Sequence, residues 1–214
     1  MALAFLTSNA HVYVDGLNLY YGALKGTPYK WLDLGRLCKF LLPRDEIARI
    51  NYYTAMVVAH PDDRDAPTRQ GFYLRALRTI PNLSIYYGHF LTQARYLPLA
   101  SPLPGGPTKV RVLKDEEKGS DVNLATHLVR DGFRGAFEVA VVISNDSDLL
   151  EPIRVVRYEL GLPIGILNPH KKPSRALSPH VTFFKQIRPG HLKRSQFPSI
   201  LTDNVGTFTK PRSW

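Results

Sequence analysis

Acidic residues recur in this sequence at the places where hydrophobic stretches end. One apolar run is followed at once by Asp15, and a later run is followed by Asp146 and Asp148. Between the two, Asp121 opens an amphipathic stretch. Carboxylates that meet at one place repel one another unless a cation lies among them, and carboxylate oxygens suit Mg²⁺ and Mn²⁺. The pattern therefore predicts a Mg²⁺ or Mn²⁺ site that acts on phosphate groups.

Each of these carboxylates also has an ordinary structural explanation. Asp15 lies between a strand-like and a helix-like stretch and could cap the helix. Asp121 lies in a first helical turn, where the helix dipole favours an acid. Asp148 and Glu151 have the spacing of a capping box. Asp146 would then precede the cap, which makes it the freer metal ligand of the pair.

Three other side chains could take part in chemistry. Lys118 could neutralise charge on a scissile phosphate, or it could pair with the acids beside it. His127 lies in the same helical stretch as Asp121 and could act as a base, but a histidine with satisfied hydrogen bonds or an exposed one is the simpler interpretation. Cys38 is the single cysteine and has helical spacing, so we expect a buried structural thiol. One cysteine excludes a disulfide framework and a Cys-rich zinc site, and a reducing cytoplasm is expected.

The elements that must position these residues alternate between strand-like and helix-like patterns. The strand-like stretches are 11–15, 50–58, 83–91, 138–144, 163–167 and 181–187, and the helix-like ones are 16–24, 33–42, 65–80, 120–132 and 147–160. This alternation predicts an α/β layered fold with helices on both faces of the sheet. Ligands bind such sheets at the carboxyl ends of the strands. Residues 92–113 are rich in Pro and Gly and are expected to form a long loop, as is most of the chain beyond Pro189.

Basic residues are concentrated at the end of the chain. Residues 1–167 carry 19 Lys and Arg against 17 Asp and Glu, whereas residues 168–214 carry 9 against 1, and the whole chain has a net charge of +10. The asymmetry indicates a nucleic-acid partner, or alternatively a solvated tail. The candidate RNA-binding residues are Lys171, Lys172, Arg175, Lys193 and Arg194. Tyrosines also occur in adjacent pairs, of which a minority could stack on bases.

The length and hydropathy of the chain narrow its class further. Its 214 residues fit one domain with extensions. No apolar run approaches the roughly 20 residues that a membrane span needs. Residues 1–9 lack the charged and apolar regions of a signal peptide, so a cytoplasmic protein without a membrane partner is expected. The chain has neither a P-loop nor a GxGxxG motif.

Three stretches, Val12–Asn18, Lys118–Ala125 and Val142–Asp148, resemble the NYN domain family. This family is the LabA-like branch of the PIN-like nuclease superfamily, and the resemblance covers about residues 10–168. It implies a PIN-like Rossmannoid three-layer fold, with a central, mainly parallel sheet flanked by helices. We therefore expect an NYN nuclease domain over 1–168 and a basic C-terminal extension over 169–214.

The resemblance also assigns roles to the acidic residues. It implies a metal-dependent ribonuclease in which Asp15 is the first acidic ligand, Asp121 the ligand from a helix, and Asp146 with Asp148 the pair after a core strand. Asn18 matches the residue that supports the first aspartate, and Lys118 matches the basic residue before the second.

The sequence departs from many members of the family at two positions. Asn145 replaces a glycine, and His127 replaces an acid. The leading hypothesis is an endoribonuclease with Mg²⁺ or Mn²⁺. The alternative is a catalytically weak or inactive RNA-binding module. The expected partner is single-stranded or structured RNA, and self-association into a homo-oligomer stays open.

Overall fold

The computed structural model describes residues 8–214 and is built on one six-stranded sheet. Every neighbouring pair of strands in this sheet is parallel, and the strand order is β3-β2-β1-β6-β7-β8. The strands are β1 (Ser8–Asp15), β2 (Asp45–Thr54), β3 (Leu83–Tyr87), β6 (Val139–Ile143), β7 (Ile164–Asn168) and β8 (Phe183–Gln186). The predicted α/β fold with a central parallel sheet is confirmed.

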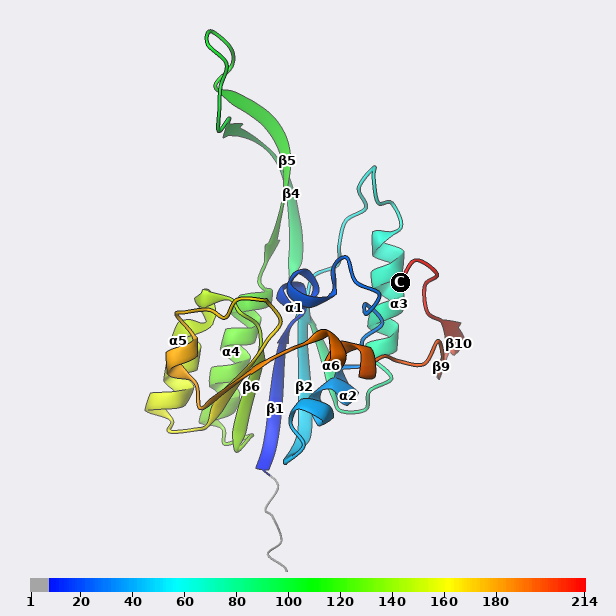
Figure 1. Ribbon diagram of the computed structural model, residues 1–214, viewed down its shortest axis with the longest axis vertical. Helices are drawn as coiled ribbons and strands as arrows, with labels where there is room; N and C mark the ends of the chain where they lie inside the picture. The colour runs from blue at the N-terminus through cyan, green and yellow to red at the C-terminus, as the bar shows by residue number, and fades with distance from the viewer. Residues whose placement is uncertain (1–7) are drawn as a thin grey trace, which may run out of the picture.

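Helices cover both faces of the sheet (Figure 1). One face carries α1 (Gly16–Leu19) with η1 (Tyr20–Leu24), α2 (Leu34–Leu41), α3 (Ala66–Leu77) and α6 (Pro189–Arg194). The other carries α4 (Ser120–Phe133), η2 (Ser147–Leu149), α5 (Leu150–Arg154) and η3 (Val155–Glu159), with η4 (Ser178–His180) beside α5. Strand β1 shows why two cores form. Val12 and Val14 pack in the first and Tyr13 in the second, because successive strand residues point to opposite faces.

The strand order places a topological switch point between β1 and β6. From β1 the chain builds outward through β2 and β3, and it then returns to β6 on the other side of β1. The connections that leave the carboxyl ends of these two strands therefore run in opposite directions. In an open α/β sheet this arrangement creates a crevice, which is where ligands bind. Asp15 ends β1, and Ser144 to Asp146 follow β6, so both lie at this crevice.

A two-stranded arm projects from the body of the molecule (Figure 1). It consists of antiparallel β4 (His89–Pro98) and β5 (Lys109–Lys118), joined by residues 99–108. The prediction of a long loop over 92–113 was wrong for most of this range. Strand β4 was missed because every residue from 91 to 105 is exposed, so the alternation of buried and exposed positions that marks a strand is absent there. We call β4, β5 and their connection the arm.

The C-terminal segment is structured and packs on the body, contrary to the expected loop beyond Pro189. It forms α6 and a hairpin of β9 (Ile200–Asp203) and β10 (Gly206–Thr209). The ring of Trp31 meets those of Phe197, Phe208 and Trp214 at 5.8, 6.5 and 6.3 Å between centroids. Arg75 binds Asp203 through two hydrogen bonds of 2.7 Å. These contacts hold the last residues against α3.

The sheet does not end at the expected domain boundary after Asn168, because β8 pairs with β7 beyond it. No helix within residues 8–214 is long and apolar enough to cross a membrane. The expectation of no signal peptide rests mainly on residues 1–7, which lie outside the described residues. Burial raises the pKa of the Cys38 thiol to about 12, as a structural cysteine requires.

Candidate active site

Asp15 lies at the base of the crevice and is 5% exposed. One carboxylate oxygen accepts a hydrogen bond from the backbone N–H of Asn18 at 2.9 Å, which caps α1. The other accepts from the Ser144 hydroxyl at 3.0 Å. Burial nevertheless raises the pKa of Asp15 to about 6, with a further contribution from the charges of Asp146 and Glu117. Asp15 is therefore both a helix cap and a carboxylate held at an energetic cost.

Asp146 lines the same crevice as Asp15. Its backbone N–H donates to the Ser144 hydroxyl oxygen at 3.1 Å, so Ser144 connects the two acidic turns. The Asn18 side-chain oxygen accepts from the N–H of Asn145 at 3.0 Å and adds a second connection. The Ser144–Asp15 and Asn145–Asn18 hydrogen bonds fix the turn after β1 against the turn after β6. Asn18 thus supports the site through the β6 turn as well as through Asp15.

The capping arrangement around Asp148 differs from the predicted capping box. Asp146 is the N-cap of η2 and accepts from the N–H of Asp148 at 3.0 Å. Asp148 follows in the first turn with an exposed side chain, and Glu151 lies 3.9 Å from Arg154. The expectation that Asp146 precedes the cap was wrong, because a single 3₁₀ turn begins there before α5. Asp148 influences the site through its charge, which helps to raise the pKa of Asp121.

Asp121 reaches the crevice from the first turn of α4. Its pKa is raised to about 7, first by burial and then by the charges of Asp15, Asp146 and Glu117. Gly119, the N-cap of α4, has φ +94°, a backbone conformation that favours glycine. This turn lets the chain leave β5 and enter α4 at the edge of the crevice. Asp121 shares the crevice with Asp15 and Asp146.

Glu117 is a fourth carboxylate, which the sequence analysis missed. Its side chain accepts a hydrogen bond from the N–H of Ser120 at 3.0 Å and so satisfies one donor at the start of α4. A methyl group on Gly88 would overlap the Glu117 carboxylate and the Lys118 carbonyl oxygen, so glycine permits this close approach. Strand alternation could have separated Glu117 from Glu116 and Lys118, had β5 been recognised.

Lys118 forms an ion pair with an acid of its own strand and does not line the crevice. Its ammonium lies 3.0 Å from Glu116, which also binds Lys114 at 2.7 Å. These two contacts lower the pKa of Glu116 to about 2. The arrangement matches the alternative in which Lys118 pairs with a neighbouring acid, and the assignment of Lys118 to the phosphate stays a prediction.

The side chains around the crevice enclose a cavity of about 230 Å³, which we call the acidic cavity. It is lined by Asp15, Asn18, Glu117, Asp121, Asp146 and His170, together with Leu17, Tyr21 and Ser120. Sequence reasoning did not identify His170, which comes from the loop after β7. His127 is not part of the lining. Its Nδ1 lies 3.0 Å from the Tyr53 hydroxyl, and its ring packs on Tyr86, so it has the satisfied role that was expected.

The acidic cavity offers oxygen donors of the kind that Mg²⁺ and Mn²⁺ prefer. Across residues 8–214, no three His, Cys, Asp or Glu side chains are already drawn together closely enough to hold a metal ion. Mg²⁺, however, is usually held by one or two carboxylates while it keeps several waters. Burial first, and then repulsion from the other acids, raises the pKa values of Asp15 and Asp121, and such an ion would offset the repulsion. The residues therefore fit a hydrated divalent cation.

Two groups of basic residues occupy different places. Lys171, Lys172 and Arg175 are exposed on the loop after β7. Asn145 holds this loop beside Asp146, because its amide donates to the Lys172 carbonyl at 3.1 Å and accepts from the Ser174 N–H at 2.7 Å. The second group, Lys193 and Arg194, lies on α6, where Arg194 covers the ring of Phe40 in α2.

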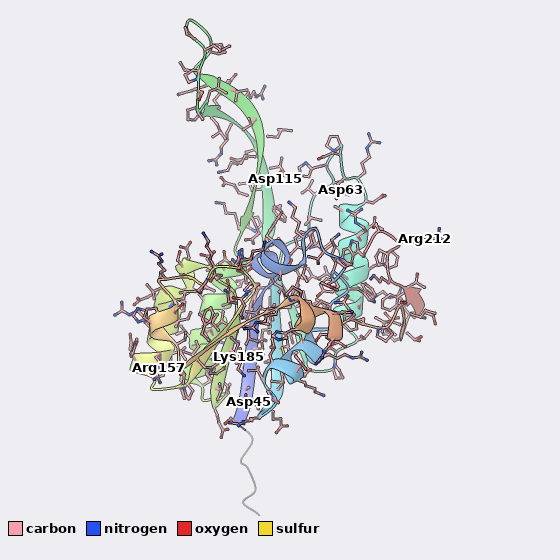
Figure 2. The ribbon with its side chains drawn as sticks, viewed as in Figure 1. Asp45, Asp63, Asp115, Arg157, Lys185 and Arg212 are labelled. Atoms are coloured by element: carbon pink, nitrogen blue, oxygen red, sulfur yellow. The ribbon has the colours of Figure 1, made fainter. Side chains whose placement is uncertain are left out.

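A second, larger cavity of about 380 Å³ adjoins the acidic cavity, and we call it the aromatic cavity. The two share Leu17 and Tyr21 in their walls. Its rings are Tyr20, Tyr21, Tyr52, Tyr73, Phe90 and Trp214, and its basic residues are Lys25, Lys30, Arg69 and His60. Figure 2 labels two acids of its wall, Asp115 on the arm and Asp63 before α3. The arm and the loop before α3 thus both contribute to this cavity.

The central parallel sheet with helices on both faces is that of a PIN-like α/β fold. A model of the NYN domain matches residues 9–184, so the chain belongs to the NYN domain family. The match ends within β8 and therefore extends past Asn168.

Two known proteins resemble the chain over most of its length. The chain is 29% identical to 6-hydroxy-3-succinoylpyridine 3-monooxygenase HspA of Pseudomonas putida (strain DSM 28022 / S16), over 95% of this chain and 74% of that protein. A crystal structure of a protein of unknown function from Vibrio parahaemolyticus RIMD 2210633 superimposes with a TM-score of 0.57 at 14% identity. That match covers 88% of this chain and 98% of the Vibrio chain. At this identity the second match supports the fold alone.

Proposed function

We propose that the protein is a metal-dependent endoribonuclease that hydrolyses RNA phosphodiester bonds at the acidic cavity. The observation that carries the proposal is the convergence of Asp15, Glu117, Asp121 and Asp146 on one cavity from three segments, the end of β1, the β5–α4 junction and the turn after β6. A protein that only bound RNA would gain nothing from four carboxylates facing a phosphate. Membership of the NYN family supports a nuclease-like function.

The residues of the cavity have distinct roles in this proposal. Asp15, Asp121 and Asp146 would hold Mg²⁺ or Mn²⁺, which when bound stabilises charge on the phosphate and activates a water. Ser144 and Asn18 keep the Asp15 and Asp146 turns in register. Glu117 holds the start of α4 and thereby positions Asp121. Asp148 lies outside the cavity lining and would contribute at longer range.

The basic residues would bind the RNA backbone. Lys171, Lys172 and Arg175 stand beside Asp146 and could guide a strand toward a cavity that would otherwise repel it. Lys193 and Arg194 on α6 could extend this contact along the face of the molecule. Phosphate contacts of this kind position the strand without selecting its sequence.

The test is cleavage of a single-stranded RNA by the full chain with added Mg²⁺ or Mn²⁺. Parent, Asp146→Asn and the matched surface variant Glu159→Gln would be purified in parallel, because Glu159 is exposed in η3 and lines neither cavity. We expect cleavage that needs the ion, survives in Glu159→Gln and disappears in Asp146→Asn. Equal activity in all three would identify a contaminating nuclease. RNA binding by the parent without cleavage would favour the inactive RNA-binding module.

A second candidate is suggested by the aromatic cavity together with the name of the Pseudomonas relative. That protein is named as a monooxygenase of a substituted pyridine. A cavity of about 380 Å³ with aromatic walls and basic side chains has the size and lining of a small-molecule site. Hydroxylation would need dioxygen and a reduced nicotinamide or flavin as electron donor. The parent protein should oxidise that donor only when substrate is present, and Arg69→Ala should lose this oxidation. That result would establish this candidate over the nuclease.

A further inference from the structure

The aromatic cavity opens beside the acidic cavity, and residues of one segment separate the two. Leu17 of α1 and Tyr21 of η1 contribute to both walls. Figure 1 shows this segment directly below the foot of the arm. A ligand that occupies both cavities therefore has to pass over the α1–η1 turn. A continuous strand can do this, with one part in each cavity.

Several hydrogen-bonding groups in the wall of the aromatic cavity are already engaged within the protein. The Tyr73 hydroxyl is already used in a bond of 3.0 Å to the Leu32 carbonyl. Both side-chain groups of Gln70 are also engaged, with Val57 and Ala55. At the boundary of the two cavities Tyr21 is 62% exposed, and its ring packs edge-on against Tyr20 at 5.3 Å. Exposed and partly exposed rings of this kind are suited to stacking against a flat ligand.

Two lysines, Lys25 and Lys30, lie in the wall of the aromatic cavity together with its aromatic rings. The Lys25 ammonium is 4.9 Å from the centre of the Tyr21 ring, and Lys30 also faces the cavity. The ion pairs in the wall use other groups, because Arg69 binds Asp63 and His60 binds Asp115. Across residues 8–214 neither Lys25 nor Lys30 forms a salt bridge. The site is therefore matched to a flat ring that carries an anionic group.

We infer that the aromatic cavity binds one base of the RNA strand, next to the phosphodiester bond that lies at the acidic cavity. This inference rests on the proposed function. The base stacks at Tyr21, Lys25 and Lys30 contact the adjoining phosphate, and the strand crosses Leu17 into the acidic cavity. Stacking accepts every base, because each has an aromatic face, so the cavity fixes the position of the strand more than its sequence.

The test uses abasic nucleotides to remove one base at a time. A single-stranded RNA of about 10 nucleotides, within the usual size of such sites, would be prepared with an abasic ribose at each position in turn. Binding to the full chain would be measured by fluorescence anisotropy in EDTA, where no cleavage occurs. Three proteins would be compared, namely the parent, Tyr21→Ala and the control Tyr158→Ala. Tyr158 is 59% exposed in η3 and lines neither cavity.

We expect one abasic position to weaken binding to the parent and to Tyr158→Ala by roughly tenfold, the loss typical of one stacked base. Tyr21→Ala should bind the intact RNA about as weakly as the parent binds the RNA that is abasic at that position. Removing the base at that position should not weaken binding to Tyr21→Ala any further. Equal effects of every abasic position, or the same pattern in Tyr21→Ala as in the parent, would overturn the inference.

Two further outcomes separate this inference from the proposed function. If the abasic pattern holds but no ion supports cleavage, the base site stands and the nuclease proposal fails. If cleavage occurs but Tyr21→Ala changes neither binding nor KM, the nuclease stands and the base site fails. Competition with a nucleoside 5′-monophosphate and with a pyridine carboxylic acid adds a final check. Displacement of RNA by the pyridine acid alone would overturn the base site in favour of a small-molecule site.

Discussion

At the level of single residues, the acidic cavity combines structural and chemical roles in the same side chains. Asp15 and Asp146 each cap a helical turn with one oxygen, and each still has lone pairs directed elsewhere. The caps hold the carboxylates in place, and for Asp15 burial beside other acids raises the pKa and makes the charge costly. A helix cap and a metal ligand are therefore compatible assignments for one aspartate. The sequence alone presented them as alternatives.

Replacement of Asp146 by Asn should separate these two roles. Asn is as good an N-cap as Asp, so we expect the melting temperature to change little, whereas Asp146→Ala should cost about 0.5–2 kcal/mol of stability. Both variants should lose metal-dependent cleavage by at least about 100-fold, because the charge that holds the ion is gone. Thermal melting and a cleavage assay on the same preparations measure the two effects. Near-parental activity in Asp146→Asn would remove Asp146 from the site.

The stability of the metal-free protein should depend on pH through Asp121 and Asp15. Their pKa values are raised from 3.8 to about 7 and about 6. The folded protein thus holds these protons more tightly than the unfolded chain, so the stabilisation is complete below pH 3.8 and is lost as the pH rises through about 6 and 7. Asp121→Asn should therefore melt at a higher temperature than the parent at about pH 8 and lose most of this advantage at about pH 5.

Repulsion among the carboxylates of the acidic cavity also predicts how a divalent ion should change the melting temperature. Mn²⁺ should raise the melting temperature of the parent at about pH 8, where the carboxylates are charged, and much less at about pH 5. Its effect on Asp121→Asn should be smaller at both pH values. Glu159→Gln is the matched control and should respond to Mn²⁺ as the parent does. Equal stabilisation of all three proteins would show that the ion binds elsewhere.

At the level of elements, the sequence predicted those that bury an apolar face and missed those that do not. Helix α4 shows an amphipathic pattern and strand β6 is a continuous apolar run, and both were predicted; α2 lies within the predicted range 33–42, with Asp33 accepting from the Arg36 N–H. The arm has no buried face, so its strands carry no periodic pattern. The β9–β10 hairpin is held by distant partners such as Arg75 and Trp31. Glu117 was missed for the same reason, because its position depends on the register of β5.

The arm should contribute little to the stability of the body. Neither of the two core clusters formed by the described residues contains a side chain from 89–118. Ala94 and Leu113 lie opposite each other, so an Asn-Gly turn could replace residues 95–112 and close the shortened hairpin. We expect the free energy of unfolding in urea to stay within about 0.5 kcal/mol of the parent value. A larger loss would show that the arm packs against something, for which a second copy of the chain is the first candidate to test by sedimentation.

At the level of the whole molecule, the sequence predicted the parallel three-layer fold because strands and helices alternate along the chain. The proximity of Asp15 and Asp146 followed from the same alternation, since all parallel strands end at one edge, whereas Glu117 and Asp121 come from the unrecognised β5–α4 junction. The location of the basic residues could not be predicted in this way. Lys171 and Lys172 come to the acidic cavity through Asn145, a contact between segments 27 residues apart. Asn145 is a departure from many family members, and here it holds the basic loop.

The position of the two basic groups predicts different effects on RNA binding. Lys171→Ala/Lys172→Ala should flatten the dependence of log affinity on log salt by about 1.4, at about 0.7 for each lost phosphate contact on a single strand. Lys193→Ala/Arg194→Ala removes the same charge. It should flatten the slope less, because Arg194 is held over Phe40 on α2. Asp45, which begins β2 just after that helix, lies at the opposite end of the body from Asp115 at the foot of the arm (Figure 2).

Neither double variant should move the position of cleavage, since phosphate contacts carry no sequence information. Binding titrations at several salt concentrations, with the same RNA, give both slopes. Equal flattening by the two pairs would mean that net charge alone attracts the RNA and that the basic loop has no special place. A larger effect of the α6 pair would direct the strand across α2 and α6, and the loop after β7 would then need another role. We expect the Lys171/Lys172 variant to flatten the salt slope more than the Lys193/Arg194 variant. That result would place the RNA backbone beside Asp146, where metal-dependent cleavage requires it.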